Sequence, residues 1–146
     1  MTSDALEAAE GLGTCGSEHA DRSERDRTLA PEVAAELAAS AIPSMLVPRA
    51  LGGGERSPGE MVEALEVIAR SDGSTAWCAM VAATSGLVSA YLDPDFAREA
   101  FAPPAVGGGV YAPIGRARLD GDEYVVSGRW PFASGAKHAT TLMGGA

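Results

Sequence analysis

The residues best suited to chemistry in this chain lie near its C-terminal end, in SGRWPFASGAKHA, residues 127–139. Trp130, Phe132 and Ser134 stand at every second position there, and Gly135 follows directly. Because side chains two residues apart point to the same side of a β-strand, this spacing predicts a surface with two aromatic rings and a hydroxyl. Such a surface suits a flat ligand with apolar faces and a polar rim. Gly135 would let the backbone bend and pass close to that ligand.

The same pattern has a second interpretation, in which no ligand takes part. Trp130 and Phe132 could belong to the core between a sheet and helices, where aromatic side chains commonly pack. His138 also has two interpretations, because a histidine beside a ligand can transfer protons, whereas an isolated histidine more often makes structural hydrogen bonds. From the residues alone, a structural role is the simpler interpretation of all three.

Other kinds of catalytic site find no support in the sequence. No His, Cys, Asp and Glu residues have the spacing of metal ligands, and no Ser/His/Asp arrangement or nucleophile elbow is present. His19 is not assigned a role. The stretch GLGTCG, residues 11–16, matches the dinucleotide pattern GxGxxG. It lacks the preceding strand and following helix that would bring a phosphate to a helix N-terminus, so we interpret the match as coincidental.

Charge and composition exclude several classes of partner. The net charge is −9 and Lys137 is the single lysine, which argues against a nucleic-acid surface. No apolar run reaches the roughly 18 residues that cross a bilayer, and the N-terminus lacks the pattern of a signal peptide. Cys15 and Cys78 cannot form a disulfide framework. We therefore predict a cytoplasmic protein without a membrane or nucleic-acid partner.

The elements that must hold the 127–139 segment divide the chain into helices first and strands afterwards. Residues 1–27 are polar, acidic and poor in large apolar side chains, which is typical of a disordered tail. Residues 28–103 predict an all-α domain, in which the capping box SPGE starts a helix at Ser57. A further helix over residues 74–91 is apolar nearly all round, so we expect it to be buried on several sides.

From residue 104 the apolar period changes to that of strands. The clearest prediction is a hairpin that joins residues 116–119 to 124–129 through DGDE. The fold class is therefore α+β, with residues 104–146 as the beginning of a small antiparallel β domain. The sequence stops within an apolar strand, and a complete sheet seldom leaves such an edge unprotected. We expect these residues to be the front part of a longer protein.

Three stretches together resemble the acyl-CoA dehydrogenase superfamily: LVPRALGGG, EVIARSDGSTAWCAM and GRARLDGDEYVVSGRWPFASGAKHA. More closely, they resemble its flavin-dependent monooxygenase branch, the reduced-flavin aromatic hydroxylases. The resemblance covers residues 28–146, and its last stretch is the most specific. It implies an N-terminal helical domain, a middle β domain, and a C-terminal four-helix bundle that is missing from this sequence. It also implies homotetramers, with the flavin between the β domain and the bundle.

The resemblance implies that the aromatic segment, residues 127–139, binds a flavin, which could be FMN or FAD. Trp130 and Phe132 would wall the flat ring. The Ser134 hydroxyl or a neighbouring backbone N–H would donate to it and stabilise the flavin intermediate, which makes Ser134 the candidate catalytic residue. Gly135 would let the backbone pass close. Tyr111, in an earlier strand, would belong to the other flavin-facing segment.

By the same resemblance, the complete protein would be a two-component monooxygenase. A separate flavin reductase would supply reduced flavin, and O₂ would hydroxylate an aromatic or polycyclic substrate. The stretch YAPIGRARLD lacks the Thr, Glu and Gly-Ser-Asp turn of true acyl-CoA dehydrogenases, which favours the hydroxylase branch. A dehydrogenase with bound FAD is one alternative, and a truncated module that acts only through protein contacts is another. We expect the 146 residues alone to be inactive, with the catalytic base in the missing part.

Overall fold

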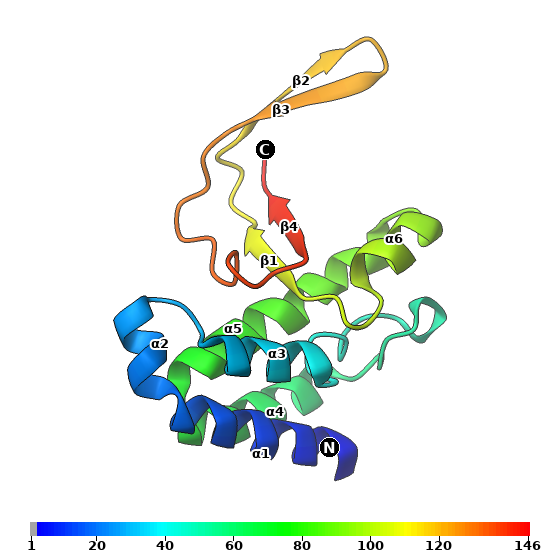
Figure 1. Ribbon diagram of the computed structural model, residues 1–146. Helices are drawn as coiled ribbons and strands as arrows, with labels where there is room; N and C mark the ends of the chain where they lie inside the picture. Colours follow the sequence, from blue (N-terminus) through cyan, green and yellow to red (C-terminus); the bar gives the residue numbers. More distant parts are fainter. Residues whose placement is uncertain (1–2) are drawn as a thin grey trace.

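The polypeptide folds into a layer of helices that carries a smaller β region on one side (Figure 1). The computed structural model describes residues 3–146. The predicted α+β order, with helices first and strands afterwards, is confirmed. The helical elements are α1 (Ser3–Glu18), α2 (Ala20–Asp26), α3 (Pro31–Ala39), η1 (Arg49–Leu51), α4 (Pro58–Ser71), α5 (Gly73–Ser85), η2 (Gly86–Tyr91) and α6 (Pro94–Phe101).

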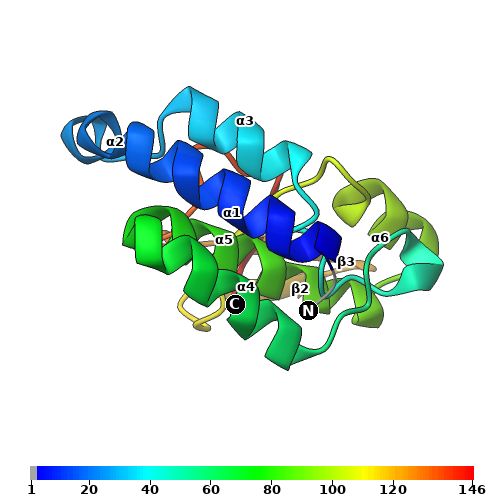
Figure 2. The same cartoon turned by 90° about the horizontal axis from the view of Figure 1, so that it is seen from below.

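The expectation of a disordered tail over residues 1–27 is wrong for the part that the structure describes. α1 lies between α3 and the pair formed by α4 and α5 (Figure 2). Its Ala5, Ala9 and Leu12 side chains are buried in the main core. The physical reason is that most residues on this buried side are small. They contribute little hydrophobicity to the sequence pattern, but they allow neighbouring helices to approach closely.

The GLGTCG stretch lies inside α1, where it serves helix packing. A Cβ atom on Gly13 would lie 3.3 Å from the Ile68 Cα of α4. A Cβ atom on Gly16 would lie 2.5 Å from the Thr75 Oγ1 of α5. These two glycines therefore allow α1 to approach α4 and α5 closely, and within residues 3–146 no strand precedes the dinucleotide pattern.

α4 and α5 both begin at capping residues. The predicted capping box of α4 is confirmed, because the Glu60 N–H donates to Ser57 Oγ (3.2 Å) and the Ser57 N–H donates to Glu60 Oε2 (3.0 Å). At α5, the Thr75 N–H donates to Asp72 Oδ1 (2.6 Å). These bonds satisfy backbone N–H groups that would otherwise lack partners in the first turn.

α5 differs in two ways from the helix predicted over residues 74–91. It ends at Ser85, and the chain continues as the 3₁₀ helix η2. Ala76 and Ala79 are buried, but Trp77 is 58% exposed. α5 packs against α4, β1 and α1, so the predicted burial on several sides is confirmed, but the side that carries Trp77 remains open.

The main core lies between α1, α3, α4 and α5, and a smaller cluster lies around η1 and α6. The largest fully buried apolar side chains of the main core include Leu12, Val33, Leu37, Ile42 and Ile68. Within residues 3–146, no helix is both long and apolar enough to span a membrane.

The β region consists of two separate pairs of strands. β1 (Gly107–Val110) pairs with β4 (Thr141–Gly144) in parallel, and β2 (Arg116–Asp120) pairs with β3 (Glu123–Ser127) as an antiparallel hairpin. The predicted hairpin is confirmed. The parallel pairing of β1 with β4 differs from the expected antiparallel order, because the chain makes a long excursion through the hairpin before it returns beside β1. Every residue of β2 and β3 is exposed, and the hairpin projects away from the helices (Figure 1).

Candidate functional site

The segment between β3 and β4, residues 128–140, is here named the aromatic loop. It forms turns, so the predicted strand alternation of its side chains is wrong. The Ser134 N–H donates to the Phe132 carbonyl (2.8 Å), and the His138 N–H donates to the Gly135 carbonyl (3.0 Å). Phe132 (φ 59°) and Gly135 (φ 81°) both have left-handed backbone conformations. The predicted bend at Gly135 is confirmed, and it is the turns that decide where each side chain points.

Trp130 is held firmly by the backbone around it. Its indole N–H donates to the Gly145 carbonyl (2.8 Å). Cβ atoms on Gly115, Gly128 and Gly144 would come within 2.5–2.8 Å of its ring, so only glycine leaves room for the indole at these positions. Trp130 therefore joins the two strand pairs, and its contacts with these glycines lie within the β region.

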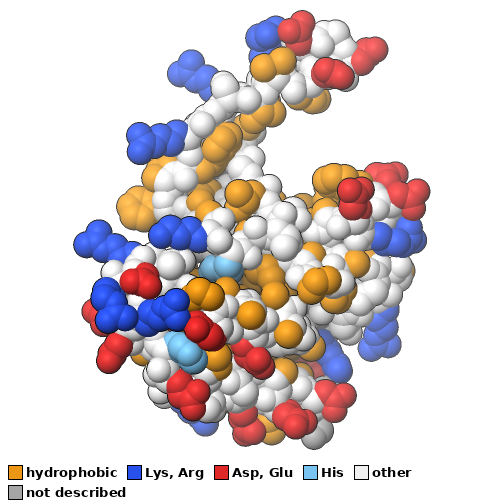
Figure 3. Space-filling view, viewed as in Figure 1, with side chains coloured by type: hydrophobic (Ala, Val, Ile, Leu, Met, Phe, Trp, Pro, Cys, Tyr) orange, Lys and Arg blue, Asp and Glu red, His pale blue; other side chains and the backbone are white. Residues whose placement is uncertain are grey.

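Trp130 also lines a cavity of about 500 Å³ between the strand pairs, together with Val126, Leu142 and Met143. The space-filling view shows a hollow between the projecting hairpin and α6, with hydrophobic side chains on both of its sides (Figure 3). A cavity of this size and lining suits a flat apolar ligand.

Phe132 and Tyr111 have different environments. Phe132 is 96% exposed and makes its turn at a φ angle that is uncommon for an aromatic residue. Tyr111 follows β1, and its hydroxyl donates to the Thr84 carbonyl of α5 (3.1 Å). Phe132 is thus a free aromatic surface, whereas Tyr111 ties the β region to the helical layer.

Ser134 also connects the two layers. The Trp77 indole N–H on α5 donates to Ser134 Oγ (3.0 Å). Ser134 and Gly135 line a cavity of about 260 Å³, whose walls also include Trp77, Cys78 and His138. The structure therefore divides the predicted site residues: Ser134 and Gly135 share this cavity, Trp130 lines the one between the strand pairs, and Phe132 and Tyr111 line neither.

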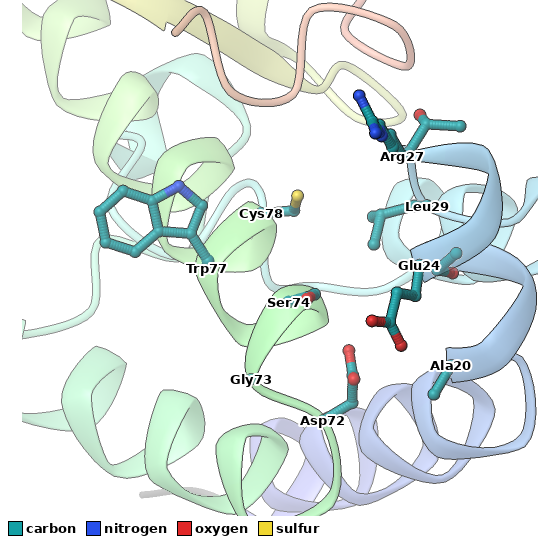
Figure 4. Close-up of a pocket in the computed structure, with 11 residues that line it drawn as sticks. Ala20, Glu24, Arg27, Leu29, Asp72, Gly73, Ser74, Trp77 and Cys78 are labelled. Atoms are coloured by element: carbon teal, nitrogen blue, oxygen red, sulfur yellow. The ribbon is translucent and has the colours of Figure 1, made fainter.

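A larger cavity of about 580 Å³ adjoins the one at Ser134. Both cavities are lined by Trp77 and Cys78 of α5 and by Arg27 and Leu29 of the segment between α2 and α3. The close-up view shows Leu29 across from Cys78, with acidic side chains gathered toward the start of α5 (Figure 4). We name the two adjoining cavities the α5 groove.

Two titratable groups in the α5 groove near the aromatic loop, His138 and Cys78, have shifted pKa values. Burial lowers the pKa of His138, so its imidazole is neutral. Both His138 ring nitrogens are buried and have no hydrogen-bond partner among residues 3–146. Burial, assisted by the negative charge of Asp72, raises the pKa of Cys78 to about 11, which keeps the thiol protonated. The His138 imidazole and the Cys78 thiol therefore face the smaller cavity of this groove as neutral groups, and the thiol is not a nucleophile. Arg27 and Lys137 line the same cavity and add positive charge to it.

Trp77 is the site residue that the sequence analysis missed. Its helical spacing placed it with the buried residues of an apolar helix, and nothing in the local pattern distinguishes an exposed tryptophan from a buried one. The relevant signal was chemical, since an indole N–H usually finds a hydrogen-bond partner.

Comparison with known proteins gives relatives in sequence, although no family model matches the chain. An indole-3-acetate monooxygenase of Acinetobacter baumannii is 34% identical over 99 residues, which are 64% of this chain and 24% of that protein. The oxygenase component of an FADH₂-dependent resorcinol hydroxylase of a Rhizobium species is 38% identical over 100 residues, which are 63% of this chain and 23% of that protein. The matched part of this chain thus spans about a quarter of the length of these relatives.

Solved structures match almost the whole chain. XiaF from a Streptomyces species, in complex with FADH₂ and glycerol, has a TM-score of 0.87 and 23% identity, over 97% of this chain and 37% of its own. The HsaA monooxygenase of M. tuberculosis has a TM-score of 0.85 and 26% identity, over 97% of this chain and 39% of its own. These matches confirm the resemblance inferred from the motifs: the chain has the acyl-CoA dehydrogenase-like fold and is similar to reduced-flavin monooxygenases.

Proposed function

We propose that this chain is part of the oxygenase component of a two-component monooxygenase that hydroxylates an aromatic or polycyclic substrate. One sequence relative is named as a monooxygenase, another as the oxygenase component of an FADH₂-dependent hydroxylase, and XiaF holds FADH₂. Reduced flavin would supply two electrons and two protons, so that one atom of O₂ enters the substrate and the other leaves as water. A separate reductase would produce the reduced flavin, and the complete protein would be a homotetramer.

The observation that carries this proposal is the pairing of a donor and an open aromatic surface on the aromatic loop. The Ser134 hydroxyl accepts from Trp77, and its own proton remains available for donation. Phe132, two residues earlier, exposes 96% of its surface. An isoalloxazine ring needs an apolar wall and a few donors directed at its carbonyl and nitrogen atoms. The loop offers both, but Ser134 lines the α5 groove and Phe132 lies outside it, so the residues present fit a flavin that extends beyond the groove.

The predicted site residues would have different tasks around a flavin. Ser134 would donate a hydrogen bond to the flavin, and Gly135, at a φ of 81°, would bring the backbone close to it. Phe132 would cover the ring and exclude water from it. Trp130 and Tyr111 would keep the loop and β1 in place through hydrogen bonds that already occupy their polar atoms. FAD is the favoured flavin, because both the resorcinol hydroxylase and XiaF are described with FADH₂.

Anaerobic titration of the complete protein that contains these residues with reduced FAD tests the proposal. We expect saturable binding, and we expect Ser134→Ala to weaken it by about two- to tenfold, because one net hydrogen bond contributes about 0.5–1.5 kcal/mol. Tyr91→Phe is the matched control, since Tyr91 is 89% exposed on η2, away from the loop. Equal affinities of the wild type and Ser134→Ala would contradict the role of Ser134. A chain that purifies yellow with oxidised FAD would favour the dehydrogenase alternative.

A further inference from the structure

We propose that Trp77 is a positioning residue, which turns the Ser134 hydroxyl into a donor directed away from α5. This inference rests on the proposed function, in which Ser134 faces the flavin. It adds a residue of the helical layer to a site that the sequence placed entirely in the β region.

The Trp77 indole and the Ser134 hydroxyl differ in the hydrogen bonds that they can make. An indole N–H can only donate, whereas a serine hydroxyl has one proton to donate and two lone pairs to accept with. Because Ser134 Oγ accepts from the Trp77 Nε1–H at 3.0 Å, its own proton must point in another direction. A serine without this partner would rotate freely and could present either a lone pair or a proton to a ligand. Trp77 therefore selects the donating orientation.

Competing partners for the Ser134 hydroxyl are absent from the surroundings that the structure describes. His138 lines the same cavity, but neither of its ring nitrogens is hydrogen-bonded to any residue in the described range. The Ser134 backbone is fixed separately, since its N–H donates to the Phe132 carbonyl and its own carbonyl packs on β1, 3.2 Å from a Cβ built on Gly108. The backbone is thus held by the β region, and the hydroxyl is held by α5.

The position of Trp77 depends on the fixed backbone of α5, because its own side chain is not buried in the core. Asp72 caps the start of α5, and the buried Ala76 and Ala79 fix the helix against its neighbours. The Trp77 ring itself is 58% exposed, so hydrophobic burial alone does not explain its position. The hydrogen bond to Ser134 joins residues that are 57 positions apart in the sequence, and it connects two layers of the fold.

Trp77→Phe, which keeps an aromatic ring but removes the N–H, provides the test together with Ser134→Ala, the double variant and Tyr91→Phe. The sequence has two tryptophans, so the indole region of a ¹⁵N–¹H NMR spectrum holds two signals, and Trp77→Phe identifies them. We expect Ser134→Ala to shift the Trp77 signal and to speed its exchange with water, while the Trp130 signal stays in place. Ser134→Thr, which retains a hydroxyl, should preserve the Trp77 signal.

The consequence for the ligand is measured as affinity for reduced FAD. We expect Trp77→Phe to weaken binding by about two- to tenfold, as Ser134→Ala does, and the double variant to bind no more weakly than Ser134→Ala alone. Tyr91→Phe should bind like the wild type.

Different outcomes separate this inference from the proposed function. A Trp77 signal that does not respond to Ser134→Ala, or additive losses in the double variant, would overturn the inference alone. Weak binding by Ser134→Ala with normal binding by Trp77→Phe would do the same and leave the role of Ser134 intact. A complete wild-type protein that binds no reduced flavin would overturn both.

Discussion

Replacing Gly16 with alanine should destabilise the protein, although alanine is the better helix former. Gly16 lies in the last turn of α1, against α5. A Cβ atom there would lie 2.5 Å from Thr75 Oγ1 and 3.0 Å from Thr75 Cβ, which is closer than packed atoms normally approach. Thr75 is 1% exposed, and its N–H is bound to Asp72, so the threonine has little room to move aside.

The size of the effect follows from a comparison within the same helix. Overpacking of a tight interface costs about 1–3 kcal/mol. A Gly→Ala change in a helix returns up to about 1 kcal/mol through helix propensity. At Gly11 the nearest atom to a new Cβ is Glu36 Oε1 at 3.8 Å, an ordinary contact, so Gly11→Ala should be stabilising. Because the propensity gain is similar in both variants, their difference isolates the packing penalty of about 1–3 kcal/mol, or roughly 3–10 °C in Tm.

The assay is thermal and urea unfolding of the two variants and the wild type, followed by far-ultraviolet circular dichroism. Gly13→Ala should fall between them, because its Cβ would lie 3.3 Å from the Ile68 Cα, a backbone atom that can give only slightly. If Gly16→Ala and Gly11→Ala raise the midpoint equally, then α1 does not dock on α5. In that case the disordered tail indicated by composition would be the better description of residues 3–18.

Two further predictions concern ionisation. The folded state holds the pKa of His138 below its ordinary value of 6.5, so the unfolded chain binds more protons than the folded chain just below pH 6.5. The free energy of unfolding should therefore fall as the pH drops through this window. His138→Gln should reduce the slope of that free energy against pH, measured in urea titrations from about pH 7.5 to 5. An unchanged slope would contradict the burial of the imidazole. With a pKa of about 11, the Cys78 thiol is ionised in about one molecule in ten thousand at pH 7. Because urea unfolds the chain and restores the ordinary thiol pKa, iodoacetamide should label Cys78 on the order of a hundredfold more slowly in the folded chain than in urea. Rapid labelling of the native peptide that contains Cys78, seen by mass spectrometry, would show that the thiol is not desolvated.

The parts of the fold that the sequence predicted are those that depend on local signals. Ser57 and Glu60 are three residues apart, and the capping box they form needs no other part of the chain. The β2–β3 hairpin depends on a turn at Gly121 and Asp122 between two runs of strand-forming residues, which is also local. Both elements formed where expected because their stabilising contacts lie within a few residues.

The parts that the sequence did not predict depend on contacts between distant segments. α1 has few large apolar residues, and its burial depends on α4 and α5 offering a surface that small side chains can approach. The parallel pairing of Gly107 with Thr141 spans the whole hairpin and has no local signature. At the site, the hydroxyl of Ser134 was singled out by its type and by the family resemblance, and its role stays a prediction. Its partner Trp77 could not be found in the same way, because their hydrogen bond is a product of the tertiary fold.

The N-terminal helix and the candidate site meet at the first turns of α5. Thr75 and Trp77 are two positions apart, so they project from nearly opposite sides of the helix. α1 packs on the Thr75 side through Gly16, and the aromatic loop is bonded to the Trp77 side through Ser134. A shift of this end of α5 would therefore move the indole N–H relative to the loop, whose backbone is held by β1. In this arrangement α1, which resembles a tail in composition, helps to set where the Ser134 hydroxyl points.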